Sequence, residues 1–147
     1  MFNNLLLKDV LSSDVSGTVN VVSFVDKLLE LSLEQNASDI HIEPVEEQTR
    51  VRLRIDGLLY TVVEVPRSNH NAIVSRIKII SGMDIAEKRL PQDGRVDLVV
   101  SGRKVDLRIA TIPVVKGEKL VIRLLDKGQQ LKTLDSLDYT DANLETY

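Results

Sequence analysis

The sequence predicts an α+β domain in which two helices cover a mainly antiparallel sheet of about six strands. Two segments carry apolar residues at helical spacing, and shorter segments between them are rich in β-branched residues or alternate polar with apolar side chains. The expected order is helix, three strands, helix, three strands. The turns between successive strands are short, which favours antiparallel pairing because parallel strands need long crossover connections.

The first expected helix begins at Thr18, whose hydroxyl can cap it, and ends near Asn36. Residues 38–43 then alternate polar and apolar side chains before Pro44, which is typical of a half-buried strand. We expect the helix to cover one face of the sheet with a single apolar stripe. The stripe consists of Val21, Val22, Val25, Leu28, Leu29 and Leu33.

The next two strands are predicted as a hairpin. Residues 50–55 alternate arginine with aliphatic side chains, and residues 58–65 form a second β-rich run. The pair Asp56-Gly57 between them is a strong signal for a tight turn, because glycine accommodates the positive φ that such turns require.

The second half of the chain repeats the order of helix and strands. A helix is predicted over residues 68–81, and Gly82 is a natural stop. Its apolar face consists of Ile73, Val74, Ile77 and Ile80, with Arg76 and Lys78 expected off that face. A Pro and Asp-Gly turn then leads back to the sheet. The three strands expected after it are residues 95–100, 103–112 and 119–125, with the last two joined by a loop over residues 113–118.

The domain organisation is expected to be one domain with two appendages. Residues 1–17 mix short apolar patches with Ser, Asp and Gly and are interpreted as a flexible leader. Residues 18–126 form the domain. Residues 127–147 begin with a polar break followed by spaced leucines and are interpreted as a linker or docking segment.

Composition and missing motifs exclude several functions. A net charge of -3, a pI of 5.4 and the lack of Trp argue against a nucleic-acid partner. There is no apolar run of membrane-spanning length, so direct membrane insertion is not expected. The absence of Cys fits a reducing compartment, and a cytoplasmic location is expected. No phosphate-binding GxxxxGK[ST] loop is present, so these residues alone are not expected to be an enzyme.

The most informative residues are Arg108 and Arg123, on the two strands that form the last expected hairpin. Residues paired across an antiparallel hairpin have a constant index sum. If Leu107 pairs with Leu124 on the face that requires burial, then Arg108 lies directly opposite Arg123 on the other face. A shift of one residue would place an arginine among the aliphatic side chains.

Two like charges in this position destabilise the sheet, so an anion should offset them. One interpretation is that Asp106 or another nearby carboxylate neutralises both in a solvated network. The other is that a partner supplies the anion, since guanidinium groups match phosphate oxygens and remain charged. Two arginines on one rigid face would then form a phosphate clamp or a pair of arginine fingers.

Other polar patterns carry less functional information. Arg50, Arg52 and Arg54 form a second basic stripe, expected to be a solvated strand face. His41 shares a face with Asp39 and Glu43, a spacing that metal sites also use, but hydrogen bonding is the expected role and no metal site is predicted.

Five strings of residues stand out together, namely residues 37–44, 52–57, 75–95, 105–109 and 117–126. In their order and spacing, from about residue 19 to residue 126, they resemble the type II secretion and type IV pilus assembly ATPases.

The resemblance implies that the chain is similar to the second N-terminal domain of those enzymes, a PAS-like α+β unit preceding a RecA-like ATPase domain. It implies a hexameric parent that uses ATP and Mg, lies at the inner face of the cytoplasmic membrane and works with other pilus or secretion components. Residues 127–147 would lead to the ATPase domain, which would be the partner in the same or an adjacent subunit.

Arg108 and Arg123 match family arginines that reach the γ-phosphate of ATP, so the resemblance makes them catalytic and nucleotide-binding candidates in the assembly. The hairpin arginines Arg52 and Arg54, with Arg89 and Arg95, are expected to face neighbouring domains. The alternative is a self-contained PAS-like sensor or protein-interaction module with no role in ATP hydrolysis. No cofactor is expected in the fragment itself.

Overall fold

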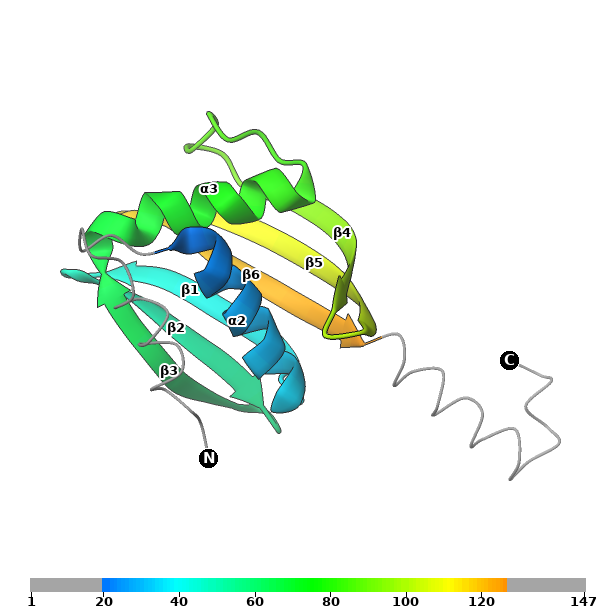
Figure 1. The fold of residues 1–147 in the computed structure, drawn as a ribbon. Helices are drawn as coiled ribbons and strands as arrows, with labels where there is room; N and C mark the ends of the chain where they lie inside the picture. Colours follow the sequence, from blue (N-terminus) through cyan, green and yellow to red (C-terminus); the bar gives the residue numbers. More distant parts are fainter. Residues whose placement is uncertain (1–19, 127–147) are drawn as a thin grey trace, which may run out of the picture.

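A computed structural model describes residues 20–126, in which two helices lie across one face of a single twisted sheet (Figure 1). The six strands are in the order β3-β2-β1-β6-β5-β4, and every neighbouring pair is antiparallel. This confirms the predicted α+β class with an antiparallel sheet and two covering helices. The expectations for residues 1–17 and 127–147 lie outside the described residues.

Helix α2 spans Val21–Glu34 and starts later than the sequence predicted. Its N-cap is Asn20, not Thr18, because the Asn20 side chain accepts a hydrogen bond of 3.2 Å from the backbone N–H of Ser23. At the other end Asn36 has a φ of 56°, the left-handed conformation that ends helices and that asparagine tolerates well.

The first three strands follow the prediction closely. They are β1 (Asp39–Val45), β2 (Gln48–Ile55) and β3 (Leu58–Pro66). The predicted tight turn joins β2 to β3, with φ of 52° at Asp56 and 81° at Gly57. A register shift between Val51 and Arg52 bends this pair.

The remaining elements differ from the prediction mainly at their ends. A short 3-10 turn, η1 (Arg67–Asn69), leads into α3 (His70–Ser81), and Gly82 ends that helix with a φ of 73°. Strand β4 (Gln92–Val100) begins three residues before the predicted start. The loop predicted over residues 113–118 is wrong, because β5 (Arg103–Val114) and β6 (Gly117–Asp126) continue through it and only two residues form the turn.

The core lies between the two helices and the sheet face that they cover. It is aliphatic apart from Phe24 and Met83, as the composition suggested. Strands β1, β5 and β6 contribute alternate residues to it, including Ile40, Ile109 and Ile122. The opposite sheet face carries no helix among the described residues (Figure 1). Neither helix in this part of the chain is long and apolar enough to cross a membrane.

One charged pair is buried beneath α3, contrary to the expectation that Lys78 lies off the apolar face. The Lys78 side chain is 1% exposed, and its Nζ lies 2.9 Å from the carboxylate of Glu118 at the start of β6. The same Nζ donates to the carbonyl oxygen of Glu87, at 2.7 Å, in the segment between α3 and β4. The long aliphatic stem of lysine lets the residue pack in the core while its ammonium group reaches these acceptors.

His70 forms a second buried polar contact at the beginning of α3. Its Nε2 is 2.6 Å from the carbonyl oxygen of Glu118, and its Nδ1 is 3.0 Å from the hydroxyl of Thr49. A carbonyl only accepts hydrogen bonds, so Nε2 carries the proton and Nδ1 accepts from Thr49. Burial lowers the pKa of His70 below its ordinary value, which keeps this neutral form in the folded state.

We predict that Lys78→Met lowers the free energy of unfolding by about 3–5 kcal/mol, because the Glu118 carboxylate then stays buried without its cation. Urea denaturation measures this. The matched control is Lys27→Met, which removes a partly exposed lysine paired with Glu30 at 3.3 Å and should cost less than about 1 kcal/mol. Equal effects of the two substitutions would contradict the role assigned to the buried pair.

We predict that the domain loses stability as the pH falls below about 6.5, the pKa of histidine in an unfolded chain. Since the folded-state pKa of His70 is lower, the unfolded chain binds the proton first, and acid favours unfolding. The measurement is the unfolding midpoint between pH 7.5 and 5.0 with and without His70→Gln. Both proteins carry His41→Gln, because the pKa of His41 is also lowered. Equal slopes in the two proteins would contradict the prediction.

Candidate functional site

Arg108 and Arg123 lie directly opposite each other on β5 and β6, as the sequence predicted. The same register pairs Leu107 with Leu124 and Ile109 with Ile122 on the buried face. Both arginines are on the helix-free face, with 57% and 67% of their side chains exposed. Neither is sealed in the interior, so both guanidinium groups are accessible to a ligand.

The arginines belong to a row of charged residues that crosses five strands. Arg95 on β4 lies opposite Arg108, and Asp39 on β1 lies opposite Arg123. Arg54 on β2 follows, opposite Asp39. Arg95, Arg108 and Arg123 are therefore neighbours on adjacent strands, and Asp39 is the next residue in the row.

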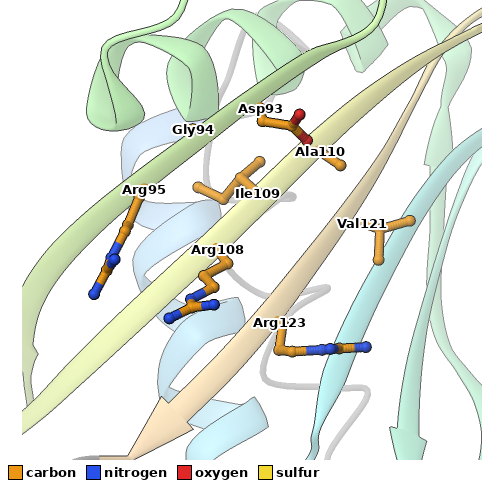
Figure 2. A pocket seen from close by; sticks show the side chains of 8 residues that line it. All are labelled: Asp93, Gly94, Arg95, Arg108, Ile109, Ala110, Val121 and Arg123. Carbon is orange, nitrogen blue, oxygen red and sulfur yellow. The ribbon is translucent and has the colours of Figure 1, made fainter.

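These three arginines line an open depression of about 570 Å³ on this face (Figure 2). The backbone beneath it belongs to β4, β5 and β6, so the side chains project from rigid strands and not from loops. Figure 2 shows the Arg123 guanidinium turned toward β1, while Arg95 and Arg108 extend toward the same side of their strands. The other lining residues are Asp93, Gly94, Ile109, Ala110 and Val121.

Two carboxylates contact the arginines, and each serves two of them. Asp106 Oδ2 is 3.3 Å from Nη2 of Arg95 and 4.0 Å from Nε of Arg108. Asp39 accepts a hydrogen bond of 3.3 Å from Nε of Arg123, and its other oxygen is 3.5 Å from Nε of Arg54. Asp106 thus contributes to neutralisation, as one interpretation of the sequence held, and each of the two carboxylates is shared between two arginines.

The geometry suits a phosphate group. Guanidinium groups present fixed N–H donors that match phosphate oxygens, and they cannot lose their charge at any working pH. An anion in the depression would neutralise the row, and its charge would compete with Asp39 and Asp106 for the same donors. The site can therefore exchange internal carboxylates for an external anion without moving its backbone.

The second basic stripe is paired with acids on the same face. Arg50 lies opposite both Glu43 and Glu64, and its Nε is 3.2 Å from the Glu64 carboxylate. Arg52 forms an ion pair with Glu43. Arg50 and Arg52 are therefore balanced by Glu64 and Glu43, whereas Arg54 shares Asp39 with Arg123.

His41 lies opposite Arg52 and Val121, beside the arginine row. Burial, followed by the nearby charge of Lys119, lowers the pKa of His41, which keeps the ring neutral. Residues 20–126 contain no group of three acidic or histidine side chains arranged to hold a metal ion.

The sequence did not predict that Arg95, Asp39 and Arg54 belong to this row. Arg95 could have been found, because the Ser101-Gly102 turn fixes the β4–β5 register by the same index rule that was applied to β5 and β6. Asp39 could not, because the pairing of β1 with β6 joins segments far apart in the sequence. Arg89 lies apart from the row, in the segment between α3 and β4.

Residues 14–147 match the family model of the type II/IV secretion system proteins. This chain belongs to that family. It is 48% identical over 124 residues to the type II secretion system protein HxcR of Pseudomonas aeruginosa. It is also 49% identical over 109 residues to the type IV pilus assembly ATPase PilB of Myxococcus xanthus, and 39% identical over 140 residues to the type II secretion system ATPase E of Vibrio cholerae.

The matches cover most of this chain and a small part of each relative. The match with HxcR covers 84% of the chain and 26% of HxcR. The match with PilB covers 74% of the chain and 19% of PilB, and the match with the Vibrio cholerae ATPase covers 95% of the chain and 27% of that protein. The chain therefore spans about a quarter of the length of the relatives that it matches, and its own secretion or pilus role is inferred below.

We predict that Arg108→Thr stabilises the domain by up to about 1 kcal/mol, because it removes a charge with an arginine opposite it on each side. The matched control is Arg50→Thr, which removes a charge with a glutamate opposite it on each side and should destabilise. Urea denaturation at low and high salt measures both, and salt should reduce the two effects. A clear loss of stability in Arg108→Thr would contradict this account of the row.

Proposed function

We propose that residues 18–126 form a nucleotide-sensing and interface domain of a hexameric ATPase that powers type IV pilus assembly or type II secretion. In this proposal Arg108 and Arg123 contact the γ-phosphate of an ATP molecule held by a RecA-like ATPase domain of the same or an adjacent subunit. The observation that carries it is the placement of both arginines side by side, exposed, on the helix-free face.

Three lines of support converge on this function. The chain belongs to the secretion family, and several relatives are named as ATPases. No GxxxxGK[ST] loop occurs in its own sequence, so the nucleotide must be held elsewhere. Four arginines of the row share two carboxylates, Asp39 and Asp106, and the phosphates of ATP can supply further negative charge.

The same electrostatics suggest how ATP state is coupled to domain position. When this domain closes over bound ATP, Arg108 and Arg123 turn from their carboxylates to the γ-phosphate, where water is largely excluded and the attraction is strong. Hydrolysis and phosphate release remove that attraction. The arginines then return to Asp106 and Asp39, and the domain separates as a rigid body.

The assembled protein is proposed to act at the inner face of the cytoplasmic membrane with other pilus or secretion components. ATP and Mg belong to the parent enzyme, bound mainly by the ATPase domain. The PAS-like designation and the arginine-finger role are parts of the same proposal.

We predict that Arg108→Ala or Arg123→Ala lowers ATP turnover of a full-length enzyme by at least about tenfold, because arginines that contact the transferring phosphoryl group contribute strongly to its rate. Folding and ATP binding should be largely retained. A practical enzyme is a chimera in which residues 18–126 replace the matching segment of the Pseudomonas aeruginosa relative.

Arg50→Ala is the matched control, since Arg50 lies on the same sheet face but is paired with Glu64. It should leave turnover within about twofold of the unsubstituted enzyme, as exposed ion pairs contribute little. Unchanged turnover in both the Arg108 and the Arg123 variants would refute the proposed function and favour a module with no role in ATP hydrolysis.

A further inference from the structure

Arg95 occupies the same row as the two proposed phosphate contacts, on the strand beyond Arg108. It lies directly opposite Arg108, its side chain is 64% exposed, and it lines the same depression (Figure 2). Neighbouring strands are about 4.8 Å apart, so the three arginines span about 10 Å of the sheet. A row of this length suits a chain of phosphates better than a single phosphate group.

The charges around Arg95 leave it available for an external anion. It forms an ion pair with Asp106, and that carboxylate also lies 4.0 Å from Nε of Arg108. Asp93 lines the depression but forms no ion pair in the described part of the chain. Asp97 lies opposite Asp106, two residues along β4 from Arg95. Because Arg95 and Arg108 are adjacent and share Asp106, an anion between them would contact both guanidinium groups.

The backbone that carries Arg95 is held firmly against the end of α3. A Cβ atom on Gly94 would lie 2.7 Å from Cε of Met83 and 3.1 Å from the backbone oxygen of Ser81. A side chain at position 94 would therefore require Met83 and Ser81 to shift. The position of Arg95 beside Arg108 is set by this packing and by continuous pairing of β4 with β5.

We propose that Arg95 is a third phosphate-contacting arginine, which together with Arg108 and Arg123 binds the polyphosphate chain of a nucleoside triphosphate. The inference rests on the proposed function, because it adds a contact to the same site. It assigns Arg95 to the ligand and not to the surface of a neighbouring domain, the role expected from the sequence.

The test uses the 147-residue chain, labelled with ¹⁵N and titrated at low salt with inorganic tripolyphosphate and, separately, with ATP. The arginine Nε–Hε signals in NMR spectra report contacts residue by residue. Those of Arg95, Arg108 and Arg123 should shift with both ligands, and that of Arg50 should not. Arg95→Ala should weaken both affinities about two- to fivefold, as expected for an exposed charge contact, and Arg95→Lys should weaken them less.

The variants separate failure of this inference from failure of the proposed function. If Arg108→Ala and Arg123→Ala weaken binding but Arg95→Ala matches the Arg50→Ala control, the third contact is refuted and the proposed function stands. If none of the three alanine variants weakens binding, the inference is refuted, and the proposed function is then decided separately by the turnover of the chimera. Binding of ATP without any binding of tripolyphosphate also overturns the inference, because recognition would then involve the nucleoside.

Discussion

The register of the β5–β6 hairpin is the constraint on which the site depends. Burial of Leu107, Ile109 and their partners on β6 fixes that register, since a shift of one residue would exchange the buried and exposed faces. The same alternation places Arg108 opposite Arg123. The hydrophobic effect therefore holds two like charges together, and the local cost of their repulsion is small compared with the aliphatic burial that imposes it.

Placing both helices on one sheet face gives the two faces different roles. The covered face supplies a continuous apolar core. The other face presents side chains from paired strands whose backbone has little freedom to move. A row of charges on such a face is organised before any ligand arrives, which reduces the entropy lost when an anion binds. The proposed ligand would account for a row in which four arginines share two carboxylates.

The helix-covered side contains its own polar contacts, which fix the ends of the elements. Lys78 ties α3 to the start of β6 and to the segment before β4, and His70 ties the beginning of α3 to Thr49 on β2. These contacts connect the two halves of the domain beneath the helices. They keep β4 and β6, which carry Arg95 and Arg123, in a fixed relation to each other.

The sequence by itself determined the class of fold, the element order and the pairing of Arg108 with Arg123, because each follows from local periodicity and tight-turn geometry. Only the tertiary structure placed Asp39 beside Arg123 and buried Lys78 against Glu118, because those contacts join segments 84 and 40 residues apart. The charge of Lys78 suggests the exposed side of the helix. A local sequence pattern cannot show that the Glu118 carboxylate, on a distant strand, lies beneath the helix and pairs with it.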